Sequence, residues 1–180
     1  MEEIFDVYTR DGEYLGTKPK SFCHGENPGV YHKPVWIWII NSSNEILVQK
    51  RAACKKNHPN KWDMPSAGHV HAGERIIDGA IRETFEELGV QTKESDYEFI
   101  CEYIADKAYE IAQVYLLHLD LRIDELRLEP QEVAAVKWLS FDEFKKFFYS
   151  DDFCRFDDEY REIVIKMLEE HLNLSHDVEE

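Results

Sequence analysis

Three glutamates gather near the end of one predicted helix, at a spacing that could hold a metal ion. On a helical wheel with about 100° per residue, Glu83, Glu86 and Glu87 share an arc of roughly 100°. Like charges at these spacings cost about 0.2–0.5 kcal/mol per pair, and the negative end of the helix dipole adds about 0.3–1 kcal/mol for each anion. Only Arg82 is adjacent to relieve this repulsion. The cluster is therefore either a solvated acidic face or a site for Mg²⁺ or Mn²⁺, which prefer oxygen ligands.

The helix that carries these glutamates is expected over residues 75–88. Its apolar residues recur at the spacing of a helix face that packs on a core, and Gly89 follows as a helix stop. The three glutamates are expected on roughly the opposite side of the helix. The predicted core face consists of Ile77, Ala80, Ile81, Thr84, Phe85 and Leu88.

The residues around the helix favour the metal site because they complete a long pattern with fixed spacing. From Gly68 to Val90 the chain reads glycine, five residues, glutamate, seven residues, Arg-Glu, two residues, Glu-Glu, one residue, glycine and an aliphatic residue. This pattern resembles the signature of the Nudix hydrolases. Thr84 departs from it, since the family favours an aliphatic residue there. Its place on the core side of the helix makes this departure a matter of packing more than of chemistry.

The resemblance implies a fold, an activity and a metal. Nudix proteins are mixed α+β proteins of the α/β class, in which an α/β/α sandwich holds a mixed β-sheet between helices. They cleave a diphosphate linked to another group with Mg²⁺ or Mn²⁺, so the implied partner is a small-molecule diphosphate substrate. Arg82 would pair with Glu74 and fix the loop before the helix. The implied metal ligands are Glu83, Glu87, Glu86 and the carbonyl oxygen of Gly68.

The resemblance leaves the general base open. The base is either one of the helix glutamates, with Glu86 orienting the attacking water, or a carboxylate from another loop. Glu110 opens a predicted strand and could be a base or a ligand that faces the helix. It could equally be a charge at the edge of a strand. The candidate catalytic residues are Glu86, Glu83, Arg82 and Glu110.

A second resemblance, over residues 4–140, is to the isopentenyl-diphosphate isomerase branch of the Nudix superfamily. In those isomerases three histidines and a later glutamate hold a metal. Two departures stand against isomerase activity: Ala67 replaces the catalytic cysteine and can neither donate nor accept a proton, and Ala108 replaces a second metal-binding carboxylate. The histidines therefore either bind a second metal or line the pocket without one. The matching positions are His24, His32, His69 and Glu110.

A basic run lies on and after a predicted strand that leads to Gly68. Its cationic side chains could receive the non-reacting phosphate of a substrate, since lysine and arginine both bind phosphate oxygens. They could also belong to a solvated loop. The run consists of Lys50, Arg51 and Lys61, together with Lys55 and Lys56.

Composition limits the partners and the compartment. The net charge of −16 over 180 residues makes nucleic acid and anionic membrane unfavourable partners. The four cysteines form no CxxC pair, the N-terminus has no basic segment followed by an apolar run, and no apolar stretch reaches about 18 residues. We therefore expect a cytoplasmic protein. The resemblance leaves a homodimer open, because dimers are common among Nudix proteins.

The pattern of predicted elements lacks a regular alternation of strands and helices, which favours a mixed sheet covered by helices. One domain over residues 1–180 is expected, with the family signature at 68–90 and a helical tail at about 157–173. Strands are predicted at 4–9, 13–17, 35–40, 46–50, 99–105, 111–119 and 135–139, helices at 75–88, 141–149 and 157–172, and irregular segments at 18–33 and 52–66.

Three functions remain to be distinguished. The intact glutamate set predicts a Mg²⁺-dependent hydrolase that cleaves a diphosphate linkage in a nucleoside-diphosphate-type or other organic diphosphate. Isopentenyl-diphosphate isomerase is the alternative that Ala67 disfavours. A non-catalytic module that senses a nucleotide would be favoured by a degenerate signature, and this signature is complete.

Overall fold

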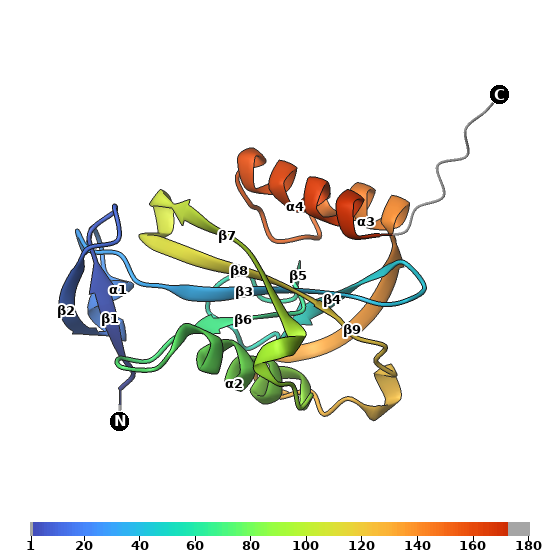
Figure 1. Cartoon of the computed structure of the whole chain (residues 1–180), viewed down its shortest axis with the longest axis horizontal. Helices are drawn as coiled ribbons and strands as arrows, with labels where there is room; N and C mark the ends of the chain where they lie inside the picture. Colours follow the sequence, from blue (N-terminus) through green and yellow to red (C-terminus); the bar gives the residue numbers. More distant parts are fainter. Residues whose placement is uncertain (1, 173–180) are drawn as a thin grey trace.

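A seven-stranded mixed sheet forms the centre of the molecule, which the computed structural model describes from residue 2 to residue 172 (Figure 1). Its strands are β3 (Pro34–Ile40), β4 (Glu45–Arg51), β5 (Trp62–Asp63), β6 (Ser66–His69), β7 (Tyr97–Ala105), β8 (Glu110–His118) and β9 (Val133–Ser140). The order is β5-β4-β3-β8-β7, with β6 beside β3 and β9 beside β4. Strands β3 and β8 are parallel and the other pairs are antiparallel.

Helices cover both faces of this sheet. Helix α2 (Ile76–Leu88) lies on one face, and helices α3 (Phe141–Phe148) and α4 (Asp158–His171) lie together on the other (Figure 1). Single 3₁₀ turns occur at Glu94–Asp96, Asp106–Ala108 and Ile123–Glu125. The predicted α/β/α sandwich with a mixed sheet is confirmed.

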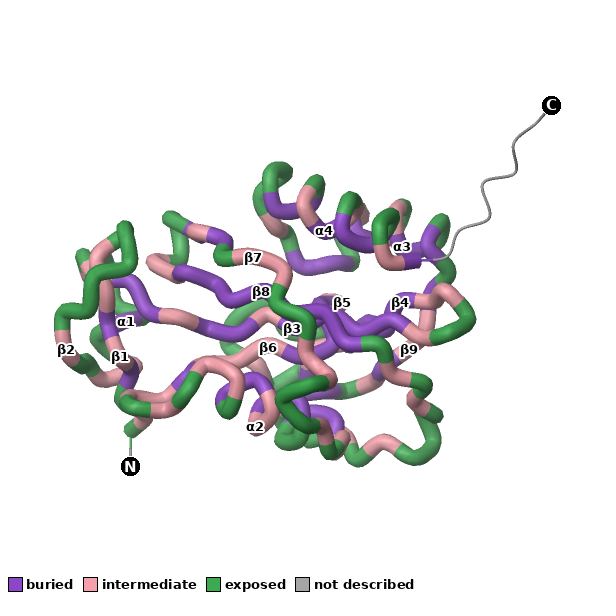
Figure 2. Tube along the Cα trace, viewed as in Figure 1, coloured by how far each residue is buried: buried purple, intermediate pink, exposed green. Residues whose placement is uncertain are grey.

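Strand β3 separates two apolar cores, because successive side chains of a strand point to opposite faces. Val35, Ile37 and Ile39 pack in the cluster under α2, whereas Trp38 and Ile40 pack in the cluster under α3 and α4. All five side chains are at most 1% exposed. Figure 2 shows that most of β3, β4 and β8 is buried. Burial on both faces explains why this strand contains no polar residue.

The N-terminal segment forms a small unit at one end of the sheet. Strands β1 (Ile4–Tyr8) and β2 (Tyr14–Pro19) form an antiparallel hairpin, and the short helix α1 (Lys20–Cys23) follows directly (Figure 1). Phe5 is 1% exposed and lies in a separate small apolar cluster. This unit brings the segment that contains His24 against the main sheet.

Most predicted elements are present, and the differences lie in two loops. Residues 52–66 were expected as one loop but include β5 and the start of β6. Residues 18–33 were expected to be irregular but include the end of β2 and helix α1. Elements of two to four residues are too short to show a hydrophobic period, so the sequence gives no signal for them. The last residue of the predicted tail, 173, lies outside the described residues.

Helix α2 is rotated relative to its predicted orientation. Phe85 was assigned to the core, but it is 50% exposed, whereas Glu83 and Glu87 are only 9% and 6% exposed. The helix approaches β6 closely at Gly68, where the Glu83 carboxylate fills the space that a Cβ would occupy. This approach turns Glu83 and Glu87 toward the sheet and leaves Phe85 facing outward. The prediction for Phe85 is therefore wrong.

In the described part of the chain, no helix is both long enough and apolar enough to cross a membrane.

Candidate active site

A broad cleft of about 1310 Å³ opens beside the end of α2. Its walls come from α2, from β6, from the loop after β4 and from the segment between α3 and α4. The cleft contains Gly68, Glu83, Glu86 and Glu87, so the structure brings together all the metal ligands that the family resemblance implied. It also contains Ala67, which places a methyl group where the isomerases carry a thiol.

The three glutamates of α2 occupy unequal environments. Burial raises the pKa of Glu83, even though the neighbouring Arg82 favours its charged form. Burial, and then the charge of Glu83, raise the pKa of Glu87 well above its ordinary value. Glu86, in contrast, has a side chain that is 54% exposed and pairs with Arg82 at 3.2 Å. Two carboxylates are therefore held side by side in low dielectric, and the third stays accessible to water.

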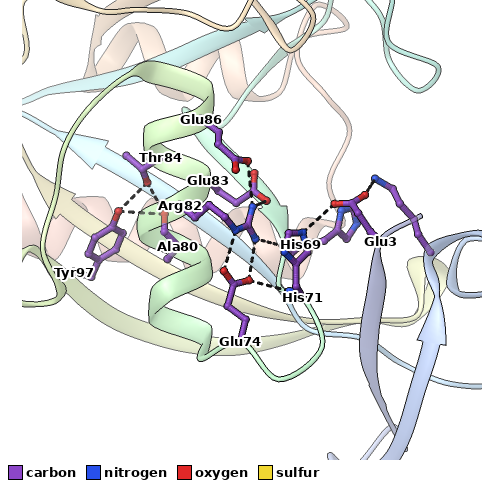
Figure 3. Close-up of polar contacts among 11 residues, drawn as sticks. Glu3, His69, His71, Glu74, Ala80, Arg82, Glu83, Thr84, Glu86 and Tyr97 are labelled. Atoms are coloured by element: carbon purple, nitrogen blue, oxygen red, sulfur yellow. Dashed lines mark hydrogen bonds and ion pairs between the residues drawn. The ribbon is translucent and has the colours of Figure 1, made fainter. Parts of the chain in front are cut away.

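Arg82 organises the cluster through five hydrogen bonds (Figure 3). Its guanidinium donates to both carboxylate oxygens of Glu74 at 2.9 Å and to the carbonyl oxygen of His69 at 2.8 Å. It also donates to Glu83 at 2.8 Å and to Glu86 at 3.2 Å. Arg82 thus connects the loop after β6 to helix α2 and holds the side chains of Glu83 and Glu86 in place.

Replacement of Arg82 by lysine is expected to lower metal-dependent turnover by about 10–100-fold, the usual effect of losing a residue that orients metal ligands. A lysine ammonium is a point charge and cannot reproduce the forked contacts of the guanidinium. The measurement is kcat and metal affinity of the variant. Arg75→Lys is the matched control, because Arg75 lies at the start of the same helix and pairs with the exposed Glu94. Equal losses in both variants would contradict the assignment.

Thr84 departs from the family pattern, and its buried hydroxyl has hydrogen-bond partners. Its side chain is fully buried, and its hydroxyl donates to the carbonyl oxygen of Ala80 at 2.9 Å. The hydroxyl of Tyr97 donates to Thr84 in turn, at 2.9 Å (Figure 3). A buried hydroxyl with two hydrogen bonds costs little, so the threonine is tolerated in the core.

A second cluster of ligating atoms includes His69, which lines the cleft next to Gly68. His24, His32 and His69 each offer a ring nitrogen, and these atoms all lie within 4.8 Å of one another. The Nε2 atoms of His24 and His69 are 3.1 Å apart. Both ring nitrogens of His32 are buried and lack a hydrogen-bond partner within the described residues. The ring of Phe5 stacks on His69 and on His32, which fixes both imidazoles.

The surroundings of His24 and His69 favour neutral rings. Burial lowers the pKa of His69 to about 2, and the charges of the other two histidines act in the same direction. Burial also lowers the pKa of His24. Neutral imidazoles with free lone pairs are the form that binds transition metals.

Glu110 belongs to this second cluster and lies outside the α2 glutamates. Its Oε1 atom is 3.4 Å from Nε2 of His32, and its side chain is 14% exposed. The backbones of His32 and Glu110 form a parallel bridge, which fixes their relative position. Glu110 lines the cleft, so its carboxylate faces the same cavity as the α2 glutamates.

The residues of the basic run lie in different parts of the structure. Arg51 and Lys55 line the cleft, where Arg51 pairs with Asp63 at 3.3 Å and Lys55 pairs with Glu132. Lys50 does not line it, because alternation along β4 turns its side chain to the face opposite Gln49. Lys61 lines a separate, smaller pocket. Only Arg51 and Lys55 of this run are therefore placed to meet a substrate phosphate beside the glutamates, and the exposed Lys56 does not line the cleft.

Three polar residues of the site were missed from the sequence. Gln49 is 4% exposed and donates to Glu87 at 3.1 Å, and a polar residue within an apolar strand was the available signal. Asp63 is buried, and burial raises its pKa despite the pairing with Arg51. Cys154 lines the cleft beside Asp63, and burial raises the pKa of its thiol. No sequence pattern linked Cys154 to the site, because it is distant in the chain.

Both clusters suit a bound cation by the chemistry of their donors. Two buried carboxylates at Glu83 and Glu87, with the arginine fork of Arg82 beside only one of them, leave negative charge without full compensation. Hard divalent cations prefer such oxygen ligands. At the second cluster, the orphaned nitrogens of His32 are polar atoms that a metal would satisfy. The cleft therefore contains one oxygen-rich and one nitrogen-rich ligand set.

Comparison with known proteins places this site in a family. A family model described as NUDIX domain matches residues 30–156. Nudix hydrolase 3 of Arabidopsis thaliana is 34% identical over 164 residues, which are 84% of this chain and 21% of that protein, so the chain spans about a fifth of its length. An isopentenyl-diphosphate Delta-isomerase of Streptomyces coelicolor is 29% identical over 140 residues, or 76% of this chain and 71% of that protein. The solved structure of DR0079 from Deinococcus radiodurans shares the fold, with a TM-score of 0.71 at 18% identity over 93% of this chain and 98% of that chain.

Proposed function

The chain belongs to the Nudix family, and from this premise we propose that it is a hydrolase that uses Mg²⁺ or Mn²⁺ to cleave the diphosphate linkage of an organic diphosphate, such as a nucleoside diphosphate derivative. The observation that carries the proposal is the pair of buried carboxylates, Glu83 and Glu87, against Gly68 in the cleft. Uncompensated buried carboxylates are costly, and a divalent cation is the partner that removes this cost.

The metal would be held by Glu83, Glu87 and the carbonyl oxygen of Gly68, and Glu86 would be either a further ligand or the residue that orients the attacking water. When bound, the metal acts as a Lewis acid on phosphoryl oxygens and lowers the pKa of a coordinated water. Arg51 and Lys55 meet the phosphate that does not react, because both are basic side chains that line the cleft. Arg82 is a positioning residue that holds Glu83 and Glu86 in register.

Glu86 is the general base that the environment favours. Its side chain is the most exposed of the three α2 glutamates, so its carboxylate can reach a water molecule in the cleft and accept a proton from it. The contact with Arg82 stabilises that charged form. Glu110 is the alternative base, and its contact with His32 ties it to the second cluster instead.

A panel assay tests this proposal. Phosphate or nucleotide release is measured with Mg²⁺ and with Mn²⁺ against nucleoside diphosphate sugars, dinucleotides, nucleoside di- and triphosphates, and isopentenyl diphosphate. We expect metal-dependent hydrolysis of at least one class, and its loss in Glu86→Gln. Hydrolysis that continues unchanged in Glu86→Gln would remove Glu86 from the mechanism. No hydrolysis in the panel would favour the non-catalytic module.

We also propose that His24, His32 and His69, with Glu110, bind a second metal ion. The convergence of the three rings and the orphaned nitrogens of His32 support this assignment. The His32→Ala variant is expected to lose about one equivalent of bound transition metal relative to the wild type, as measured by elemental analysis after purification. His118→Ala is the control, because His118 is exposed and lies at the far end of β8. Equal metal content in wild type and His32→Ala would exclude this second site.

Isomerase activity remains the second candidate function, and the histidine cluster is the observation that favours it. Ala67 opposes it, because allylic proton transfer needs an acid and a base and alanine supplies neither. The panel distinguishes the two activities: allylic product from isopentenyl diphosphate without phosphate release would favour the isomerase. The cytoplasmic location and the homodimer stay predictions.

A further inference from the structure

A second pocket adjoins the catalytic cleft and has a different character. It has a volume of about 350 Å³, and it shares His58 and Arg155 with the cleft. Its lining carries three side chains with permanent positive charge, Lys61, Arg155 and Arg161, and one carboxylate, Asp151. In a chain with a net charge of −16, this local excess of cations identifies a place where an anion is favoured.

Arg161 is the feature that makes this pocket a built site. It extends from the first turn of α4, is 9% exposed, and its Nε atom is buried with no hydrogen-bond partner among the described residues. Its guanidinium stacks over the ring of Tyr149, 4.8 Å from the centroid, and approaches Asp158 only to 3.8 Å. The buried Nε–H group of Arg161 has lost contact with water without gaining an acceptor among the described residues, which is costly, and an anionic ligand would accept its hydrogen bond.

The other two cations are free to take part. Arg155 is exposed and forms no ion pair within the described residues, and it lies where the two cavities meet. The ammonium of Lys61 donates to the backbone carbonyl oxygen of Asp151, which leaves its charge without a carboxylate partner. Two guanidinium forks and one ammonium match the geometry and charge of a phosphate monoester dianion.

We propose that this pocket binds a phosphate monoester carried by the organic group of the diphosphate substrate. The inference rests on the proposed hydrolase function, because the shared residues His58 and Arg155 make the pocket continuous with the cleft where the diphosphate would react. It narrows the substrate class: the enzyme prefers organic diphosphates with an additional terminal phosphate. Free inorganic phosphate carries the same chemistry and is the other source to distinguish.

Matched substrate pairs test this preference. NADP⁺ is compared with NAD⁺, and coenzyme A with dephospho-coenzyme A, since each pair differs by one phosphate monoester. We expect KM to be roughly tenfold to a hundredfold lower for the phosphorylated member, with similar kcat, because charge-assisted hydrogen bonds form in both ground and transition states. Arg161→Met is expected to raise KM for the phosphorylated member only. Equal KM values within both pairs would overturn the inference and leave the hydrolase function intact.

Two further measurements keep the test decisive. Lys61→Met repeats the test at a position outside helix α4, in case Arg161→Met fails to fold. Arg122→Met is the control, because Arg122 is an exposed arginine that pairs with Asp124. If no member of either pair is hydrolysed, calorimetric binding of adenosine 3′,5′-bisphosphate is compared with that of AMP. Tighter binding of the bisphosphate, lost in Lys61→Met, supports the pocket independently of hydrolysis. Equal binding of the bisphosphate and of AMP would overturn the proposed monoester site. Binding of inorganic phosphate, without any difference between the two members of either substrate pair, would overturn it as well.

Discussion

Metal-dependent hydrolysis is expected to fall by roughly a hundredfold or more when Glu87 is replaced by glutamine, because a bound metal supplies several kcal/mol of transition-state stabilisation. Glu87 is one of the two buried α2 carboxylates, and glutamine keeps its size and the acceptor oxygen that meets Gln49. The fold should therefore survive. The measurement is kcat against Mg²⁺ concentration for wild type and variant on one active substrate of the panel.

Glu87→Gln is expected to lower activity but to raise the stability of the metal-free protein. Burial raises the pKa of Glu87 in the folded chain above its unfolded value, so the ionised carboxylate disfavours the folded state. This penalty is absent below the unfolded pKa and grows as pH rises toward the folded pKa. Without metal, Glu87→Gln should unfold at a higher temperature than wild type at pH 8, and the difference should shrink near pH 4.

Added Mg²⁺ is expected to reduce this difference in unfolding temperature. A ligand that binds only the folded state stabilises it, so Mg²⁺ should raise the unfolding temperature of wild type more than that of Glu87→Gln. Calorimetry with chelator and with Mg²⁺ measures both effects on the same samples. A variant that retains wild-type turnover and the wild-type response to Mg²⁺ would remove Glu87 from the metal site.

The second large effect is expected from Gly68→Ala. A Cβ at this position would lie 2.0 Å from the carboxyl carbon of Glu83 and 2.2 and 2.4 Å from its two oxygens. Glu83 would have to leave the place where it faces the metal, and we expect turnover to fall by roughly a hundredfold or more. The measurement is kcat together with the apparent affinity for Mg²⁺.

A double-mutant cycle distinguishes this displacement from general damage to β6. If alanine acts by moving the Glu83 carboxylate, Gly68→Ala adds little to the loss already caused by Glu83→Gln. Additive losses would mean that the alanine acts through another part of the site. Ala67→Gly is the matched control, because it removes a methyl group from the adjacent residue on the same strand.

Local patterns in the sequence were sufficient for most of the elements. The helix at 75–88 and its stop at Gly89 followed from periodicity and from the left-handed conformation that glycine adopts easily, and Gly89 has a φ of 71°. The helix predicted at 141–149 begins after Ser140, whose side-chain oxygen accepts a hydrogen bond from the backbone N–H of Glu143. The segment between β4 and α2 was predicted less accurately from the sequence, since its strands are short and depend on pairing with distant segments.

The orientation of α2 shows the limit of such patterns. A helical wheel ranks side chains by polarity, and it therefore assigned Phe85 to the core. The close approach of α2 to β6 at Gly68 instead turns Glu83 and Glu87 toward the sheet and leaves Phe85 half exposed on the wall of the cleft. Functional sites are where a local rule is expected to fail, because the cost of burying charge is offset by ligand binding.

One continuous segment carries the whole signature, so the sequence alone was sufficient to predict the family and the fold class and to indicate Glu83, Glu86 and Glu87 as candidate metal ligands. The contact of Gln49 from β4 with Glu87 depends on the tertiary structure, as does the close approach of the rings of His24, His32 and His69 from three separate segments. The tertiary structure also places Arg51 in the cleft and Lys50 and Lys61 outside it, although the three residues lie close in sequence. The physical reason is that a side chain's surroundings are set by strand pairing and helix packing between residues far apart in the chain, and no local spacing records them.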